Sequence, residues 1–437
     1  MWFEQSLAPD SPHYNEAVVL RIKGRLDIPR LSEAFTQVVR RHEILRTTFH
    51  PSGDGLTQKV HPPAPVTIDP HSTDEAAPVE RMAQAEAAIR TAIRAPFDLA
   101  SPPLHRIALA PLGEEDCLLA FIVHHVALDG WSAILVFREV FAIYAAGDAA
   151  ALPDLALQYA EYAGEERAEI ASGALDAERE RWMERLSGDL PLPPLPFGRT
   201  PRTMVSGAGA HLAVTVEADL AGRLRALSRA EGATLFATMA AAFSALLAAH
   251  SGRQDILIAA PMTNRDRPEL ATLAGLFINT VLLRFPARDT DTFRDHLATV
   301  RQSVLEAQSD QRTPFQTIVG DLRERGEVAG QPLASVMFDL QRLPDAMDPP
   351  GLAVEYRQID PGTSKFDLGL SVKETDGPLL CTFEFATPLF DRAEIALVAR
   401  QYLALLARIA AEPGSSLADL LRADADDLAS IARWNET

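Results

Sequence analysis

The stretch Val123-His124-His125-Val126-Ala127-Leu128-Asp129-Gly130-Trp131-Ser132 carries a histidine pair and an Asp-Gly dipeptide between two apolar segments. Before it, residues Cys117 to Val123 are continuously apolar, which predicts a buried β-strand. After it, apolar side chains between Ile134 and Tyr144 recur at helical spacing, which predicts an amphipathic helix. The stretch is therefore interpreted as a strand-to-helix turn, which is an unusual place for this much polarity.

Strand geometry separates the two histidines. Side chains alternate between the faces of a strand, so His124 and His125 are expected to point in opposite directions, one toward a cleft and the other into packing. Asp129 follows four residues after His125 and can either orient an imidazole or fix the loop through an arginine. Gly130 permits a sharp bend and a close backbone approach at the helix start.

Two other interpretations of the pair compete at this point. Both histidines can be packed core residues whose ring nitrogens bond to backbone carbonyls, although a His-His-x-x-x-Asp-Gly pattern at a strand end is rare by chance. A metal site is disfavoured, because adjacent strand histidines do not easily reach one ion and no Cys or His cluster lies near them in sequence. We therefore assign no metal ligand.

Bulk composition bounds the class of protein. With 437 residues the chain is long enough for one large or two medium domains, and 47% hydrophobic and 23% charged residues are typical of a globular protein with a substantial core. The formal net charge is -19 and there is no basic tract, so a nucleic-acid partner is not expected. The acidity favours solubility without indicating a particular substrate.

Targeting and redox features point to the cytoplasm. Cys117 and Cys381 both lie in apolar runs and are interpreted as reduced, buried residues. The first residues lack the basic region and apolar core of a signal peptide. The least polar stretch, Ala233 to Ala249, contains Ala, Thr and Ser, so it predicts a buried helix rather than a membrane span. No membrane partner is expected.

Strands and helices alternate along the chain in two halves of similar pattern. In the first half, strands are predicted over Glu16–Ile22, Leu104–Leu109 and Cys117–His125, and helices over Arg30–Arg41, Glu80–Arg94 and much of Leu155–Arg185. In the second half, strands are predicted over His211–Val216, Asp255–Met262, Ala334–Gln341, Leu368–Lys373 and Leu379–Ala386, and helices over Asp219–Ala230, Leu235–Ser251, Asp291–Ser309 and Asp391–Ala411. Four prolines between Asp189 and Pro196 predict an extended linker and a domain boundary between the halves.

Several motifs together resemble the condensation domains of nonribosomal peptide synthetases, which are members of the chloramphenicol-acetyltransferase-like superfamily. The resemblance covers nearly the whole chain, in the segments Met1–Gln5 with Asp10–Asn15, Arg41–Thr47, His124–Ser132, Gly275–Arg284, Gln331–Leu333, Ser364–Leu368 and Arg433–Thr437. Two positions depart from the family pattern: Glu161 stands where Asp is usual, and Gln316 stands where Glu is usual. Both are expected to lie outside the chemistry.

The resemblance implies an α/β fold of two chloramphenicol-acetyltransferase-like lobes, arranged as a V-shaped pseudo-dimer with a tunnel between them. Residues 1–188 would form the N-terminal lobe with the HHxxxDG motif, and residues 189–417 the C-terminal lobe. Residues 418–437 resemble the linker that enters an adenylation domain, which would be the neighbour at that end.

The resemblance also implies a reaction and its partners. Donor and acceptor peptidyl carrier proteins would dock at opposite mouths of the tunnel and present their groups on 4'-phosphopantetheine arms, so no cofactor is expected to bind directly. The acceptor amine would attack the donor thioester and form a peptide bond, as in the biosynthesis of antibiotics and other secondary metabolites. The excised domain is expected to be a monomer, and the segments Ser11–Asn15 and Asp129–Ser132 favour an L-configured donor.

The family's second histidine faces the tunnel, so the resemblance makes His125 the catalytic candidate. A neutral imidazole there can accept a proton from the attacking amine as a general base, or it can chiefly position and stabilise the reactants. The backbone N–H of Gly130 can face the oxyanion of the tetrahedral intermediate. His124 is assigned to packing and hydrogen bonding.

The remaining site residues receive supporting roles from the resemblance. Asp129 is expected to pair with Arg284 across the lobes. Trp131 is expected to border the tunnel, and Asn279 and Gln341 either bind the pantetheine arm or substrate, or support the fold. A polar network beneath the active loop is expected from Arg41, His42, Glu43 and Arg46, although Arg41 or Arg46 can also approach His125.

Rival families share parts of this signature. An epimerisation domain also carries the histidine pair, but it is expected to have an additional catalytic Glu that the second-lobe motifs here do not show. A heterocyclisation domain would have two Asp in place of the histidine pair, and an acyltransferase that uses coenzyme A shares only His-x-x-x-Asp-Gly. A catalytically silent domain that recruits a carrier or a tailoring enzyme is the non-enzymatic alternative, although such domains typically lose part of the active motif.

Overall fold

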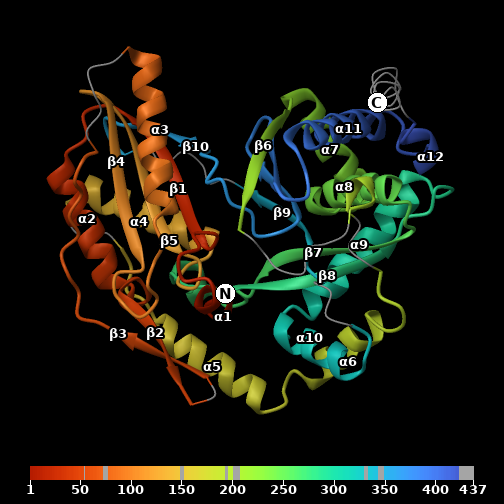
Figure 1. The fold of residues 1–437 in the computed structure, drawn as a ribbon, viewed down its shortest axis with the longest axis horizontal. Coiled ribbons are helices and arrows are strands. Elements are labelled where there is room, and N and C mark those ends of the chain that lie inside the picture. The colour runs from red at the N-terminus through yellow and green to blue at the C-terminus, as the bar shows by residue number, and fades with distance from the viewer. Residues whose placement is uncertain are drawn as a thin grey trace. The chain divides into compact units, whose positions relative to one another are not determined.

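The computed structural model describes residues 1–53, 55–71, 77–147, 152–191, 195–199, 207–328, 333–342 and 349–422. Their contacts divide the chain into two compact units (Figure 1). The first unit contains Met1–Ala174, Thr263–Ile278 and Pro344–Lys365. The second unit contains Leu175–Met262, Asn279–Leu343 and Phe366–Thr437.

This division is discontinuous, whereas the sequence predicted one boundary between the lobes, after residue 188, and a linker from residue 418 onward. The first boundary falls between Ala174 and Leu175, and two segments from the later part of the chain join the first unit. One reason is backbone pairing, because strand β10 (Ala353–Arg357) bonds antiparallel to β1 (Asn15–Lys23). Such pairing joins segments far apart in sequence, and a composition shift does not reveal it.

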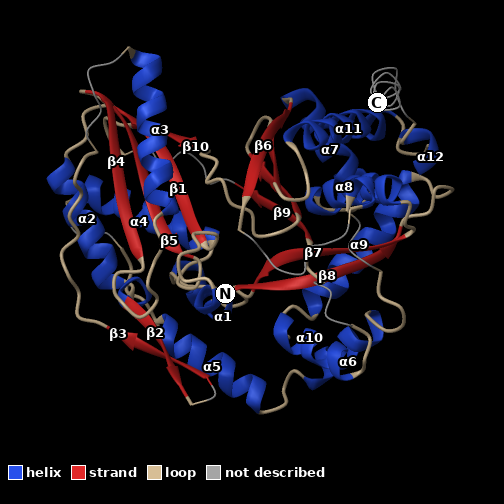
Figure 2. Ribbon diagram, viewed as in Figure 1, coloured by secondary structure: helices blue, strands red, loops and turns tan. Residues whose placement is uncertain are grey.

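The first unit contains a four-stranded antiparallel sheet in the order β10-β1-β5-β4 (Figure 2). Its central pair is β1 with β5, and β4 lies at an edge. A separate hairpin pairs β2 with β3. The elements in chain order are α1 (Trp2–Leu7), β1 (Asn15–Lys23), α2 (Ile28–Arg41), η1 (Glu43–Arg46), β2 (Thr47–Ser52), β3 (Gly55–Val60), α3 (Pro78–Arg94), β4 (His105–Gly113), β5 (Asp116–His124), α4 (Gly130–Ala146), α5 (Tyr159–Ala171), η4 (Pro268–Thr272) and β10 (Ala353–Arg357).

The apolar run before the histidine pair is β5, as predicted, and its residues from Cys117 to His124 are all buried. Burial on both faces explains why the run is continuously apolar instead of alternating. Phe121 lies in the middle of β5, with the ring of Phe35 from α2 at 6.0 Å and the ring of Phe137 from α4 at 6.1 Å. Helix α3 packs against β4, β5 and β1. The end of β5 is therefore held by a well-packed core.

The second unit contains a six-stranded mixed sheet in the order β6-β12-β11-β9-β7-β8. Strands β11 and β9 pair parallel, and β12 pairs antiparallel with both β11 and β6. The elements in chain order are α6 (Asp176–Arg185), η3 (Pro196–Gly198), β6 (Gly209–Val216), α7 (Ala218–Ala230), α8 (Leu235–Ser251), β7 (Asp255–Thr263), β8 (Ile278–Pro286), α9 (Phe293–Ser309), α10 (Phe315–Glu324), β9 (Val336–Arg342), β11 (Leu368–Glu374), β12 (Leu379–Ala386), α11 (Arg392–Ala411) and α12 (Leu417–Leu420).

Helix α8 is the apolar centre of the second unit. It contacts α7, α9, α11 and β9, and its residues from Ala237 to Ala248 are all buried. The prediction that Ala233 to Ala249 forms a buried helix is therefore confirmed. Among the residues that the structure describes, no single helix is long and apolar enough to cross a membrane; α7 and α8 pass that test only as a pair, and the chain bends by 104° between them.

Both units are mixed α/β, as the sequence predicted, and most of the expected elements are present. Strands β8 and β10 were not predicted as strands. Residues 192–194 of the expected proline linker, Gln331 and Pro332 of one family motif, and Arg433–Thr437 lie outside the described residues. Cys117 and Cys381 are buried free thiols, and burial raises the pKa of each to about 12.

A core substitution tests the packing around α8. Phe243 is fully buried, with the rings of Phe338 and Tyr402 at 6.1 Å and that of Phe383 at 6.5 Å. Phe243→Ala is expected to lower the free energy of unfolding by about 3–5 kcal/mol, because it leaves a cavity among these rings. Leu305→Ala, at a side chain that is 49% exposed, is the control, with an expected change within about 0.5 kcal/mol. Equal urea-unfolding midpoints for the two variants would contradict the packing.

Candidate active site at the turn after strand β5

Backbone hydrogen bonds hold the turn between β5 and α4. Strand β5 ends at His124, and the N–H of His125 donates to the Tyr14 carbonyl at 2.8 Å, next to the last β1–β5 pair. The N–H of Ala127 donates to the His124 carbonyl at 2.9 Å. The N–H of Asp129 donates to the Gly275 carbonyl at 3.0 Å. The turn is therefore anchored both to Tyr14, the residue before β1, and to the segment Thr263–Ile278.

A hydrogen bond of defined polarity holds the ring of His125. Its Nδ1 lies 2.8 Å from the Leu128 carbonyl oxygen. A carbonyl only accepts, so Nδ1 carries the proton, and Nε2 of the neutral ring keeps its lone pair. Burial lowers the pKa of His125, an effect that the Glu16 carboxylate partly opposes. The ring is thus a neutral base at physiological pH, with Nε2 as its basic atom.

A carboxylate and an ammonium lie beside that basic nitrogen. Oε1 of Glu16, on β1, is 3.7 Å from Nε2 of His125. The same carboxylate forms a salt bridge with Nζ of Lys365. Glu16 and Lys365 are both partly exposed, whereas the His125 residue is only 8% exposed. Glu16 and Lys365 were not among the predicted site residues, although Lys365 stands in the family-like segment Ser364–Leu368.

His124 is a packed structural residue in this geometry. It is fully buried, its Nδ1 accepts the N–H of Val126 at 3.1 Å, and its Nε2 lies 3.4 Å from Oε1 of Gln5. The Phe97 ring meets it edge-on at 6.4 Å. Burial, together with repulsion from a charged His125, lowers the pKa of His124 to about 3, so the ring is neutral. Both of its nitrogens face protein groups.

Asp129 joins the turn to the segment Thr263–Ile278. Its Oδ1 caps α4 by accepting the Ser132 N–H at 2.7 Å, and its Oδ2 accepts the Phe277 N–H at 2.9 Å. A guanidinium nitrogen of Arg265 lies 3.6 Å from Oδ1 and donates to the Ser132 hydroxyl at 2.6 Å. That hydroxyl in turn donates to the Gly275 carbonyl at 2.7 Å. Asp129 and Arg265 are almost fully buried, so this is a desolvated ion pair inside a hydrogen-bonded network.

The expected partner of Asp129 was wrong, because Arg265 occupies the place assigned to Arg284. Arg284, near the end of β8, instead pairs with Asp255 at 2.9 Å and donates to the carbonyls of Ser187 and Asp189 at 2.9 and 3.1 Å. Arg265 follows strand β7, in a Thr-Asn-Arg run that breaks an apolar pattern. This polar run at the end of an apolar strand is the sequence feature that could have identified Arg265 as a site residue.

A glycine is required where this network is tightest. A Cβ built on Gly275 would lie 2.1 Å from Cδ2 of Tyr159 and 2.8 Å from Cε2 of Phe277. The Tyr159 hydroxyl donates to the Leu276 carbonyl at 2.9 Å, and its ring meets that of Phe277 edge-on. The backbone of Gly275 can therefore reach Asp129 only because this residue has no side chain.

The expected polar network beneath the loop is built around two carboxylates. Arg41 and His42 bind the two oxygens of the buried Glu139, at 3.2 and 2.7 Å. Arg46 binds Glu43 at 3.2 Å and the His61 carbonyl at 2.6 Å. Arg41 and Arg46 thus contact Glu139 and Glu43 respectively, whereas the ring nitrogens of His125 lie near Leu128 and Glu16.

Gly130 and Trp131 open helix α4. Because Gly130 is the first helical residue, its N–H belongs to the first turn, which has no intrahelical acceptor. This fits the expected role of an oxyanion donor. The side chain of Trp131 is 50% exposed, with the Arg138 guanidinium 5.9 Å from its ring centre. Such exposure of a large aromatic side chain is compatible with a substrate-facing position.

Asn279 makes the contacts of a fold-supporting residue, which is one of the two roles that the sequence left open. Its amide nitrogen donates to the carbonyls of Gln311 and Thr313 at 2.8 and 2.7 Å, and its amide oxygen accepts the Phe315 N–H at 3.1 Å. Both amide hydrogens are therefore used to hold the start of α10. Gln341 is exposed on β9 and donates to Asp339 at 2.8 Å.

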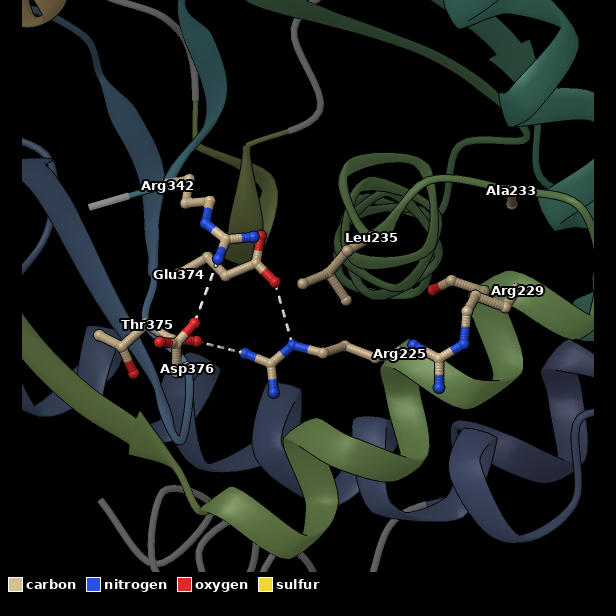
Figure 3. A pocket seen from close by; sticks show the side chains of 9 residues that line it. Arg225, Arg229, Ala233, Leu235, Arg342, Glu374, Thr375 and Asp376 are labelled. Atoms are coloured by element: carbon tan, nitrogen blue, oxygen red, sulfur yellow. Dashed lines mark hydrogen bonds and ion pairs between the residues drawn. The ribbon is translucent and has the colours of Figure 1, made fainter. Parts of the chain in front are cut away.

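A separate cavity of about 370 Å³ lies in the second unit (Figure 3). Its lining residues are Arg225, Ser228, Arg229, Ala233, Leu235, Arg342, Glu374, Thr375 and Asp376. Arg225 pairs with Glu374 at 3.0 Å, and Arg342 pairs with Asp376 at 3.1 Å. The described lining contains no imidazole, and four of its charges neutralise one another. Among the described residues, no group of three or more His, Cys, Asp or Glu side chains could hold a metal ion.

Comparisons with known proteins agree with these motifs. A family model described as "Condensation domain" matches residues 1–430. A linear gramicidin synthase of Brevibacillus parabrevis is 35% identical over 449 residues, which is 100% of this chain but only 6% of that protein. Phosphinothricin tripeptide synthetase PhsC of Streptomyces viridochromogenes is 36% identical over 444 residues, which is 100% of this chain and 40% of that protein. The chain therefore spans less than half the length of either curated relative.

Solved structures share the fold. The X-domain from teicoplanin biosynthesis matches with a TM-score of 0.81 and 26% identity, over 96% of this chain and 94% of that one. The first condensation domain of the calcium-dependent antibiotic synthetase, in complex with a substrate analogue, matches with a TM-score of 0.82 and 22% identity, over 96% of each chain. The two-lobed α/β fold expected from the sequence is thereby confirmed.

A double-mutant cycle tests which arginine serves Asp129. Asp129→Asn and Arg265→Met are each expected to lower the free energy of unfolding by about 3 kcal/mol, because either change leaves a buried partner unpaired. The double variant should lose less than the sum, with a coupling of about 1 kcal/mol or more, measured by urea unfolding.

Arg284→Met is the matched control for that cycle. Since Arg284 binds Asp255, its effect should add to that of Asp129→Asn within about 0.5 kcal/mol. Coupling of Asp129 to Arg284 but not to Arg265 would contradict the buried Asp129–Arg265 pair.

Proposed function

The chain belongs to the condensation-domain family of nonribosomal peptide synthetases, and from this premise we propose that His125 carries the amide-bond-forming step. The family has an acyltransferase-type role in general. The proposed substrates are an aminoacyl acceptor and an acyl or peptidyl donor, each held as a thioester on the phosphopantetheine arm of a carrier protein. An adenylation domain is the proposed neighbour in the full synthetase, and the cytoplasm is its proposed location.

The observation that supports this role is the hydrogen bond between Nδ1 of His125 and the Leu128 carbonyl. With Nδ1–H directed to the Leu128 carbonyl, Nε2 is left as the hydrogen-bond acceptor. An attacking amine must be neutral, and it becomes more acidic as its nitrogen bonds to the thioester carbon. Nε2 is the atom that accepts the amine hydrogen at that moment, which is general-base catalysis.

The bond changes balance without a further reactant. The acceptor nitrogen bonds to the donor carbonyl carbon, and the tetrahedral oxyanion that forms can be met by the N–H of Gly130. The intermediate collapses by breaking the carbon–sulfur bond. The proton that left the amine for Nε2 then passes to the departing thiolate, which restores the neutral ring. Alignment of the two tethered arms supplies a further share of the rate.

Removal of the imidazole tests the assignment. With loaded donor and acceptor carriers, His125→Ala is expected to reduce the amide product by about 100-fold or more, as measured by intact-protein mass spectrometry. A far-UV circular dichroism spectrum like that of the parent protein controls for folding. Unchanged amide formation in His125→Ala would overturn the assignment, and α-proton exchange without amide product would indicate epimerisation instead.

The pH dependence has a defined sign. Burial lowers the pKa of His125 below its ordinary value of 6.5, and the base must be unprotonated. The acceptor amine also loses its reactive neutral form as the pH falls, so the single-turnover rate is divided by the neutral fraction of the amine, titrated separately on the loaded carrier. The corrected rate should hold down to pH 6.5 and fall only as the pH drops through the lowered pKa of the ring. A corrected rate that falls at or above pH 6.5, in proportion to protonation of an ordinary histidine, would contradict a desolvated ring.

A further inference from the structure

Within the part of the chain that the structure describes, two ion pairs join strand β1 to residues 349–365. One links Lys23 to Glu355 at 2.6 Å, and both of its side chains are about half exposed. The other links Glu16 to Lys365, and both of its side chains are more than two-thirds buried. The pairs have opposite polarity, because the lysine lies on β1 in the first and on the later segment in the second. Either pair could serve simply to clamp the segment onto β1.

The Glu16–Lys365 pair differs because it faces the candidate base. Glu16 is opposite Val123 in the β1–β5 register, two residues before His125, and its Oε1 is 3.7 Å from Nε2 of that ring. This distance is too long for a hydrogen bond but short for an interaction between charges. Lys23 is opposite Asp116, seven residues from Glu16 along the strand. At about 3.3 Å per residue it lies roughly 23 Å away, too far to influence the ring.

We infer, on the basis of the proposed function, that Glu16 and Lys365 are positioning residues for His125: the Glu16 carboxylate is the counter-charge for the protonated ring, and Lys365 holds that carboxylate off Nε2 while the ring is neutral. A neutral ring directs its Nε2 lone pair outward, and a carboxylate that approached it closely would repel that lone pair. Once Nε2 has accepted the proton of the amine, the same carboxylate stabilises the imidazolium.

Lys365 opposes the effect of Glu16 on the protonation of the ring. Without the ammonium, the carboxylate would approach Nε2 and raise the pKa of the ring, so a larger fraction of rings would be protonated and unable to accept a proton from the amine. Without the carboxylate, the ammonium would remain near the ring and oppose its protonation. The two residues therefore have opposite effects on one proton, whereas the two halves of a structural clamp have the same effect.

Four elements place charged or titratable groups toward the ring. Glu16 comes from β1, Lys365 from the later segment, Asp129 from the turn and His124 from the end of β5. Asp129 is already neutralised by Arg265, and the lowered pKa of His124 keeps that ring uncharged. Glu16 and Lys365 are thus the pair whose charges can be changed without dismantling the turn.

The test measures the titration of the ring itself in the 437-residue protein, with no carrier protein present. Histidine side-chain nitrogens are labelled with ¹⁵N, and the His125 signals are identified by their absence from His125→Ala. Glu16→Gln is expected to lower the pKa of His125, and Lys365→Met is expected to raise it, each by about one unit. The double variant removes both charges and should return the pKa close to that of the parent.

The exposed pair provides matched controls. Lys23→Met and Glu355→Gln remove the same chemical groups from the same two segments, and both should leave the titration of His125 unchanged. Shifts of opposite sign for the Glu16 and Lys365 variants, cancelled in the double variant, support the inference. Shifts of the same sign, or no shifts, overturn it and leave a clamp as the role of the pair.

The outcome is separable from that of the proposed function. If the pKa of His125 shifts as expected but the parent protein forms no amide from loaded carriers, the proposed function is wrong and the inference about the ion pair stands. If His125→Ala abolishes amide formation but the pKa of His125 is unchanged in the Glu16 and Lys365 variants, the inference about the pair is wrong and the proposed function stands. In the amide assay, the acid limb of the rate should move down in pH for Glu16→Gln and up for Lys365→Met.

Discussion

The hydrogen bond from Nδ1 of His125 to the Leu128 carbonyl is the contact on which the proposed chemistry depends. It closes within the turn itself, so the ring and its acceptor move together. It selects the tautomer, and in the proposed reaction the tautomer makes Nε2 the atom that would accept the proton. Everything else at the site either holds this turn in shape or sets the charge around Nε2.

The shape of the turn is held by a buried polar network in which both oxygens of the central carboxylate are bonded. Asp129 caps α4, receives the Phe277 N–H and lies against Arg265, and the Ser132 hydroxyl bonds to both the N–H and the C=O of Gly275. Burying a charge is unfavourable unless its partners are in place, so this network tolerates few alternative arrangements. The free-energy cost of desolvating Asp129 and Arg265 is offset by their mutual attraction and by the hydrogen bonds of the network. These bonds exist only when the turn has this geometry.

Much of the fold and of the turn could be predicted from the sequence because they rest on local patterns. The continuous apolar run of β5, the helical spacing of α4 and the histidine pair between them are all short-range features. Strand β10 was not foreseen because its partner, β1, lies hundreds of residues earlier in the chain. The role of Arg265 was not foreseen because its partner, Asp129, is more than a hundred residues away. For the same reason, the partner of Arg284 was predicted wrongly. Its place in a family-like motif could be seen in the sequence, but its contact with Asp255 could not.

Direct observation of the His125 tautomer is the sharpest test. In ¹⁵N spectra of the histidine side chains near pH 7, the signals absent from His125→Ala should show a protonated Nδ1 and an unprotonated Nε2, because the Leu128 carbonyl can only accept. A ring protonated at Nε2 instead, or a doubly protonated ring at that pH, would contradict the account, since neither form leaves a base facing the substrate.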